Sequence, residues 1–229
     1  LMQNLKLNRE IAHLAILQRI ELCSPTLKKL RKLLGRYFFT NILSKYFINP
    51  VQISKNYHQL MTEELVIIEK YIKNKDKVLS IGSGVGGLEI LINQKFNNHI
   101  SFIEKNYISK KIKYGWDSGN KEAYNNLNLL ETFLLKNGVK KEKFEIFDYD
   151  ENNLPKSKFD LIISLYSLDY HYEYDLYRDY LTKVMKPESV LIFDTIRPDY
   201  FSQVFKTVKV LKKDFNTVHK SKRIVCTNV

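Results

Sequence analysis

A glycine-rich segment between two apolar stretches carries the clearest chemical signal in the sequence. Four of the eight glycines fall within residues 82–87. They follow residues 78–81, which have the pattern of a strand, and precede residues 88–92, which have the pattern of a helix start. Glycines permit a sharp turn and a close approach to a ligand, and the free N–H groups of a helix start attract anions. The segment therefore predicts a nucleotide-like ligand bound between a strand and a helix.

The spacing of these glycines fits two classes of cofactor. Gly82, Gly84 and Gly87 match the G-x-G-x-x-G pattern of dinucleotide-binding proteins. Gly82, Gly84 and Gly86 match the G-x-G-x-G pattern of proteins that bind S-adenosylmethionine (SAM). Glu104 ends the next apolar stretch, 22 residues beyond Gly82, where its carboxylate can accept hydrogen bonds from both hydroxyls of a ribose. Both cofactors contain a ribose, so this acid fits either of them.

A second group of polar residues follows a later apolar stretch. The strand that begins with Phe159-Asp160 leads into residues 164–172, which we expect at the edge of the sheet above a bound cofactor. His171 has an unperturbed pKa near ~6.5 and can accept a proton at neutral pH. Asp169 is a second candidate for a catalytic base.

Short apolar runs alternate with helical patterns from residue 77 onward, which predicts an α/β fold with a mainly parallel sheet. The predicted strands are 77–81, 99–104, 143–148, 158–164, 189–194, 205–212 and 222–227, and the predicted helices between them are 86–95, 107–114, 121–137 and 173–185. Only a turn separates the last two strands, so we expect them to form a terminal antiparallel hairpin. Before residue 77 the pattern predicts helices over 4–22, 26–47 and 57–73, with the second either continuous or divided in two near Gly35, and with a break at Asn49-Pro50.

The basic charge of the protein is concentrated near its N-terminus. The net charge is +12, and residues 1–60 hold 10 basic and 2 acidic residues. Within residues 26–47, Leu27, Leu30 and Leu34 share one helical face and lysines and arginine lie mostly off it. This pattern fits a helix that contacts an anionic membrane peripherally or binds a nucleic-acid backbone. It also fits a solvated helix that only packs on the domain.

The cysteines and the hydropathy of the sequence indicate in which cellular compartment the protein is expected. Cys23 and Cys226 lie 203 positions apart and form no C-x-x-C motif, which disfavours a zinc or disulfide scaffold and fits the reducing cytoplasm. No apolar run approaches the ~20 residues of a membrane span. We expect a cytoplasmic protein, with the membrane contact through residues 26–47 as a peripheral one.

The order of the motifs resembles that of the class I SAM-dependent methyltransferases. It consists of the glycine loop, the acid that closes the second strand, the acidic loop Asp150-Glu151-Asn152-Asn153-Leu154-Pro155, the Phe-Asp-Leu strand and the final hairpin. The resemblance implies a Rossmann-like seven-stranded mixed sheet in residues 57–229, whose last strand is inserted beside the fifth. Residues 1–56 would be a basic helical N-terminal extension.

The resemblance also implies the cofactor and the residues that hold it. SAM would be converted to S-adenosyl-L-homocysteine, with no metal required. The residues carried over by position for the methionine and adenosyl part are Gly82, Ser83, Gly84 and Gly86, and the ribose would be held by Glu104. Either Asp150 or Asp148 would lie near the adenine amino group, with Tyr149 beside it, and Ser164 and Leu165 would line the cofactor at the end of the fourth strand. Ser80 departs from the family, which usually has an acid there for the ammonium group of the cofactor.

A finer resemblance concerns the acceptor. The segments 114–116, 124–127, 133–139, 167–172 and 194–197 look like those of sugar O-methyltransferases of glycan assembly. That resemblance implies an oxygen of a sugar or glycan-linked small molecule as acceptor, with His171 and Asp169 as candidate bases. Trp116 would stack on the sugar, Tyr172 would follow the histidine, and Arg197 would clamp an anionic acceptor. The sequence has no Asn-Pro-Pro-Tyr or Asp-Pro-Pro-Tyr motif, which leaves adenine amino methylation unsupported.

Three other functions remain open from the sequence. An RNA methyltransferase would use the basic N-terminal helices to dock nucleic acid. A non-catalytic SAM-binding homologue would have lost turnover together with the acid at position 80. A dehydrogenase would also fit the glycines, but the sequence shows no sign of its substrate-binding half.

Overall fold

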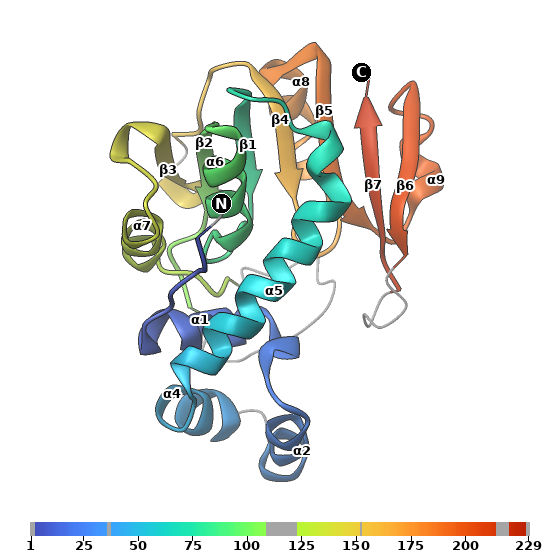
Figure 1. The fold of residues 1–229 in the computed structure, drawn as a ribbon. Helices are drawn as coiled ribbons and strands as arrows, with labels where there is room; N and C mark the ends of the chain where they lie inside the picture. Colours follow the sequence, from blue (N-terminus) through green and yellow to red (C-terminus); the bar gives the residue numbers. More distant parts are fainter. Residues whose placement is uncertain (1–2, 36–37, 109–122, 152, 214–219, 228–229) are drawn as a thin grey trace.

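The computed structural model describes residues 3–35, 38–108, 123–151, 153–213 and 220–227. A seven-stranded sheet with the strand order β3-β2-β1-β4-β5-β7-β6 forms its centre (Figure 1). The strands are β1 (Lys77–Ile81), β2 (His99–Glu104), β3 (Phe144–Asp148), β4 (Phe159–Ser164), β5 (Met185–Thr195), β6 (Thr207–Lys213) and β7 (Lys222–Thr227). The first five strands pair in parallel, and β7 pairs antiparallel with both β5 and β6. The predicted mixed sheet with an inserted last strand is confirmed.

The order of the strands places a ligand-binding edge beside β1. Because β1 lies between β2 and β4, the chain connections leave it on opposite sides, and ligands of open α/β sheets bind at such a point. Two hydrogen bonds join the strand ends there. The N–H of Gly82 donates to the carbonyl of Ile103 at 3.0 Å, and the hydroxyl of Ser164 donates to the carbonyl of Ile81 at 2.7 Å. The glycine loop, Glu104 and the end of β4 therefore meet at one edge.

Helices cover both faces of the sheet, because its central strands are apolar on both sides. One buried cluster joins the sheet to α1 (Arg9–Gln18), α5 (Pro50–Ile68), α6 (Gly87–Phe96) and α7 (Leu127–Lys136). The other joins it to α8 (Arg178–Val184) and α9 (Pro198–Phe201). In Figure 1, α5 crosses in front of the sheet, and α1 lies next to the lower part of α5. The short helical segments are η1 (Ile20–Leu22), η2 (Phe39–Leu43), α4 (Ser44–Tyr46), η3 (Glu69–Tyr71), η4 (Lys141–Lys143), η5 (Tyr149–Glu151) and η6 (Tyr174–Leu176).

The helix expected over 57–73 begins seven residues earlier, at Pro50. The dipeptide Asn49-Pro50 starts this helix, although we predicted a break there. Proline is tolerated at the first helical position, and the side chain of Asn49 accepts hydrogen bonds from the N–H groups of Val51 and Gln52. The predicted boundary between residues 56 and 57 thus falls inside α5, and residues on both sides of it share one buried cluster.

Other element boundaries differ for equally local reasons. The helix expected over 4–22 starts at Arg9, because Asn8 caps it by accepting from the N–H of Ile11. The helix expected over 121–137 starts at Leu127, where Asn126 plays the same part. The segment expected over 173–185 divides into η6 and α8, and β5 begins at Met185 instead of residue 189. Most of the helix expected over 107–114 lies outside the described residues.

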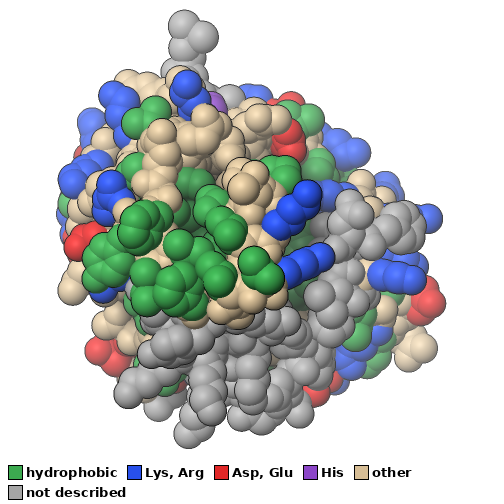
Figure 2. Space-filling model, turned by 90° about the horizontal axis from the view of Figure 1, so that it is seen from below, with side chains coloured by type: hydrophobic (Ala, Val, Ile, Leu, Met, Phe, Trp, Pro, Cys, Tyr) green, Lys and Arg blue, Asp and Glu red, His purple; other side chains and the backbone are tan. Residues whose placement is uncertain are grey.

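The helix α2 (Pro25–Leu34) buries none of its residues. Large apolar side chains are exposed on α2 and directly after α4, among them Leu33 at 81% and Phe47 at 69%. Figure 2 views the molecule from the side of α2 and α4 and shows hydrophobic side chains gathered there, with lysines and arginines beside them. No helix among the described residues is long and apolar enough to span a bilayer. The peripheral membrane contact through residues 26–47 stays a prediction.

Candidate functional site

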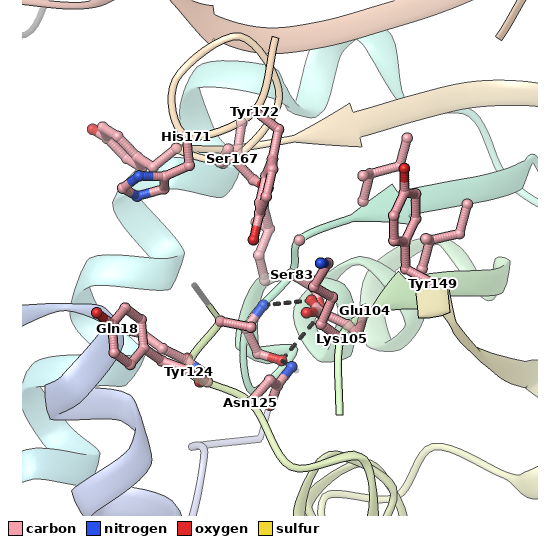
Figure 3. A pocket seen from close by; sticks show the side chains of 18 of the residues that line it. Gln18, Ser83, Glu104, Lys105, Tyr124, Asn125, Tyr149, Ser167, His171 and Tyr172 are labelled. Atoms are coloured by element: carbon pink, nitrogen blue, oxygen red, sulfur yellow. Dashed lines mark hydrogen bonds between the residues drawn. The ribbon is translucent and has the colours of Figure 1, made fainter. Parts of the chain in front are cut away.

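A pocket of about 330 Å³ opens at the edge where β1, β2 and β4 end. The glycine loop and Glu104 lie on one side of it, and His171 and Tyr172 lie on the other (Figure 3). Residues from α1, from α5 and from the segment 123–125 also line the pocket. Its size and its mixture of apolar and polar walls are those of a small-ligand site.

The glycine loop has backbone conformations and contacts that exclude larger residues at two positions. Gly82 has φ of 69°, and a Cβ there would lie 2.1 Å from the hydroxyl oxygen of Ser167. A Cβ on Gly87 would lie 2.3 Å from the ring of Tyr57, whose hydroxyl oxygen accepts a hydrogen bond from the N–H of Gly87 at 3.1 Å. The fourth glycine of the loop is therefore explained by packing of α5 on the start of α6.

Glu104 holds the glycine loop from the end of β2. One of its carboxylate oxygens accepts hydrogen bonds from the Ser83 hydroxyl at 2.9 Å and from the Gly84 N–H at 2.8 Å (Figure 3). The amide of Asn125 donates to the carbonyl of Gly84 at 2.8 Å. Burial raises the pKa of Glu104 to about 7, because a carboxylate loses hydration in this site. The predicted ribose-binding acid thus lies in the pocket, beside the loop that it was expected to accompany.

A second buried carboxylate lies beside the first strand. The hydroxyl of Ser80 donates to Oε1 of Glu89 at 2.6 Å, and Glu89 is only 2% exposed. Its Oε2 has no hydrogen-bond partner among the described residues, and burial raises the pKa of Glu89 to about 7. Glu89 lines the pocket, whereas Ser80 does not. Ser80, which stands where the resemblance leads one to expect an acid, therefore forms a hydrogen bond with Glu89 and does not itself line the pocket.

The N-terminal segment forms one wall of the pocket. Oε1 of Gln18 accepts from the N–H of Val85 at 3.1 Å, and its Nε2 donates to the carbonyl of Tyr124 at 2.6 Å. The next residue, Arg19, lies with its guanidinium 4.7 Å from the ring centre of Tyr166. Leu17, Gln18 and Arg19 all line the pocket. Residues before 57 therefore help to build the site.

Of the three residues expected near an adenine, Tyr149 alone lines the pocket. Asp148 accepts a hydrogen bond from the N–H of Asp150 at 3.0 Å. Asp150 is exposed and lies 3.4 Å from the ammonium group of Lys105. That lysine lines the pocket and lies 5.3 Å from the ring centre of Tyr149. Asp150 therefore contacts a residue of the pocket wall without lining the pocket itself, and the place of Asp148 and Asp150 near an adenine stays a prediction.

The segment after β4 places His171, Tyr172 and Leu165 in the pocket wall. Ser164 lies beneath them and outside the pocket lining, because its hydroxyl donates to β1 and also accepts from the N–H of Leu168 at 2.9 Å. The ring of His171 meets the ring of Tyr170 edge-on at 4.9 Å. His171 thus lies in the pocket wall, and Ser164 supports the loop.

Asp169 and Arg197 bind each other outside the pocket lining. Asp169 is fully buried and accepts hydrogen bonds from Nη2 of Arg197 at 2.7 Å and from the Thr195 hydroxyl at 2.5 Å. The guanidinium that was expected to clamp an acceptor neutralises this carboxylate instead. This pairing favours a structural role for both residues, so we retain neither Asp169 as a base nor Arg197 as an acceptor ligand. Trp116 lies outside the described residues.

Among the pocket residues that we did not predict from the sequence are Gln18, Arg19, Glu89 and Lys105. Only Glu89 had a signal within the sequence, as the single charge in the apolar run Leu88-Glu89-Ile90-Leu91-Ile92. A charged residue buried on an otherwise apolar helix needs a partner. Among the described residues, no three His, Cys, Asp or Glu side chains are grouped as a metal site.

No protein-family model and no curated protein matches the chain. Solved structures match its fold. The 16S rRNA N2 G1207 methyltransferase RsmC of T. thermophilus, solved with AdoMet and guanosine, is 12% identical, with a TM-score of 0.50 over 80% of this chain and 44% of that chain. A transferase from Pyrococcus horikoshii is 14% identical, with a TM-score of 0.50 over 74% of this chain and 64% of that one. An RNA methyltransferase from Salinibacter ruber, solved with S-adenosyl-L-homocysteine, is 11% identical, with a TM-score of 0.47 over 74% and 90%.

The chain spans less than two thirds of the length of the first two of these proteins. At such low identity the similarity concerns the arrangement of the elements. The strand order, the inserted antiparallel β7 and the pocket at the switch point beside β1 agree with it. The chain therefore has the Rossmann-like methyltransferase fold.

Proposed function

We propose that this protein is a SAM-dependent methyltransferase that transfers the methyl group to an oxygen of a small molecule. The observation that carries the proposal is the pair of hydrogen bonds from the glycine loop to Glu104. Both partners line a pocket at the switch point of the sheet. A dinucleotide-binding protein would share the loop, but the order β3-β2-β1-β4-β5-β7-β6 supports the methyltransferase.

The residues of the pocket fit this cofactor. Gly82 and Gly84 both line the cavity, and a Cβ there would lie 2.1 Å from the Ser167 hydroxyl oxygen and 2.4 Å from Oε1 of Gln18, respectively. The Glu104 carboxylate, buried and deprived of bulk water, would accept hydrogen bonds from the ribose hydroxyls. Tyr149 would lie against the adenine, and Leu165 would cover the cofactor from the end of β4. Each of these roles uses a residue that lines the pocket.

Bound SAM would supply a methyl group activated by its positively charged sulfur. The protein would contribute mainly by orienting the acceptor in line with that methyl group and by keeping water out. His171 would accept the proton from an acceptor hydroxyl, and Tyr172 would line the acceptor side of the pocket. The ring of Tyr170 against His171 would hold the imidazole in place.

The shape of the site supports a small acceptor such as a sugar or glycan-linked metabolite. Gln18, Arg19 and Tyr124 cover one side of the cavity, and Gln18 ties that cover to the glycine loop. An acceptor must therefore fit between this wall and the segment after β4. A folded RNA would need that wall to open, so we favour the small molecule over the RNA.

The cofactor can be tested by calorimetric titration with S-adenosylhomocysteine and, separately, with NADH. We expect micromolar binding of S-adenosylhomocysteine and no binding of NADH. The opposite preference would identify a dinucleotide-binding protein and refute the proposal. Binding of S-adenosylhomocysteine without methyl transfer to sugars, sugar nucleotides or RNA would instead support a non-catalytic homologue.

The role of His171 predicts a separation of binding from turnover. In His171→Gln, we expect kcat for the acceptor found in such a screen to fall about 10²- to 10⁴-fold, the usual contribution of a general base. The affinity for S-adenosylhomocysteine should stay within about twofold, because binding of the product does not require a proton acceptor. His99→Gln, in β2 and outside the pocket lining, is the matched control. A kcat like that of the wild type would remove His171 from the mechanism.

A further inference from the structure

We propose that the carboxylate of Glu89 binds the α-ammonium group of the amino-acid part of the cofactor. The proposal rests on the proposed function, because it assigns a residue to one end of the SAM molecule. It also explains how the site can hold an ammonium group although position 80 has a serine in place of an acid.

The position of Glu89 points to a cationic ligand. Its side chain is almost completely buried, yet it lines the pocket. One carboxylate oxygen, Oε2, has no hydrogen-bond partner among the described residues. An isolated carboxylate in such a place costs free energy unless a cation or a donor meets it. An ammonium group entering the pocket would supply both the positive charge and the donor.

The side chain of Ser80 orients this carboxylate. The Ser80 hydroxyl donates to Oε1 at 2.6 Å, which holds the group at the end of β1 and leaves the other oxygen for a ligand. The Tyr57 hydroxyl accepts from the N–H of Gly87, so it occupies a donor at the start of the same helix. Glu89 sits in the first turn of α6, directly after the glycine loop. Ser80 thus acts as a positioning residue for an acid supplied by the helix.

The two acids of the pocket would serve different ends of one ligand. Glu104 contacts Ser83 and Gly84 from the end of β2, where the ribose is expected. Glu89 contacts Ser80 on the β1 side of the loop, where the amino-acid part is expected. A ligand that lacks the ammonium group should therefore depend on Glu104 and be insensitive to Glu89.

The test compares S-adenosylhomocysteine with 5′-methylthioadenosine, which has the adenosine and the thioether but no amino-acid part. In Glu89→Gln, we expect the dissociation constant for S-adenosylhomocysteine to rise on the order of 10- to 100-fold, as for the loss of a hydrogen bond between charged groups. The affinity for 5′-methylthioadenosine should not change. Ser80→Ala should shift S-adenosylhomocysteine in the same direction by a smaller factor, and Glu142→Gln on the exposed η4 should shift neither ligand.

The outcomes separate this proposal from the proposed function. If the wild-type protein binds neither ligand, the proposed function fails and this assignment fails with it. If the wild type binds S-adenosylhomocysteine and Glu89→Gln binds it equally well, only the assignment of Glu89 is overturned. Equal weakening of both ligands would also overturn it, because it would indicate a general disturbance of the pocket. Circular dichroism of each variant shows whether it is folded before the comparison is made.

Discussion

Glu104→Gln is expected to raise the dissociation constant for S-adenosylhomocysteine about 100-fold, as for the loss of two hydrogen bonds to a charged group. The substitution keeps the shape of the side chain, so the N–H of Gly84 retains an acceptor. What it removes is the negative charge and one of the two acceptor oxygens that the ribose hydroxyls would use. Calorimetry with S-adenosylhomocysteine and with 5′-methylthioadenosine should show the loss for both, since both contain the ribose.

The exposed Glu142 provides the matched control, because Glu142→Gln removes the same charge outside the pocket lining. Binding by Glu104→Gln within about threefold of the wild type would contradict the ribose assignment. It would leave Glu104 as a residue that only holds the loop through Ser83 and Gly84.

The same substitution should have an opposite effect on the stability of the ligand-free protein. The pKa of Glu104 is raised to about 7 in the folded state, against about 4.3 in an unfolded chain. Between these values the folded protein binds more protons than the unfolded one, so the free energy of unfolding falls as the pH rises. At pH 8, Glu104→Gln should therefore be more stable than the wild type by on the order of 2 kcal/mol, and at pH 4.5 about equally stable. Urea unfolding at both pH values measures the difference.

Arg223→Met is expected to lower the free energy of unfolding by about 3–5 kcal/mol, the usual effect of removing one partner of a buried ion pair. Arg223 is fully buried and contacts two buried carboxylates. It donates to Glu64, and its Nε and Nη2 donate to Asp194 at 3.2 and 3.0 Å. Burial alone would raise the pKa of Glu64, but Arg223 and Arg19 hold it below its usual value. Methionine fills a similar volume and leaves both acids without this guanidinium.

Thermal and urea unfolding of Arg223→Met at neutral pH measure the loss, which corresponds to a fall in Tm of about 10 °C for a chain of this length. Arg178→Met is the matched control. Arg178 is half exposed and lies 3.7 Å from Asp175, so its removal should cost less than about 1 kcal/mol. An equally small loss for Arg223→Met would show that its ion pairs contribute nothing beyond the volume of the side chain.

The buried ion-pair network of Arg223, Glu64 and Asp194 also contacts residues of the pocket wall. Asp194 accepts a hydrogen bond from the N–H of Tyr166 at 2.9 Å, and the guanidinium groups of Arg19 and Arg223 lie 4.7 and 5.3 Å from the Tyr166 ring centre. Tyr166 and Arg19 both line the pocket. The network therefore fixes the wall formed by α1 against the loop after β4.

The sheet and the centre of the site follow from local patterns along the chain. The glycine loop and Glu104 belong to neighbouring strand ends, and alternating strands and helices require parallel pairing, which brings such ends to one edge. His171 and Tyr149 were found for the same reason, because each follows a strand closely. Their positions depend on local spacing and on the direction of the strands, and both can be read along the chain.

The charged residues that face the pocket could not be identified without the packing of distant segments. Asp169 and Arg197, 28 residues apart, pair with each other, and Asp150 pairs with Lys105 of the pocket wall. Gln18 reaches the glycine loop across 67 residues, and Arg223 reaches Glu64 across 159. Glu89 contacts Ser80 because α6 packs against β1, the strand that precedes it. These partners are selected by packing between distant segments, and one sequence does not record which distant side chains will meet.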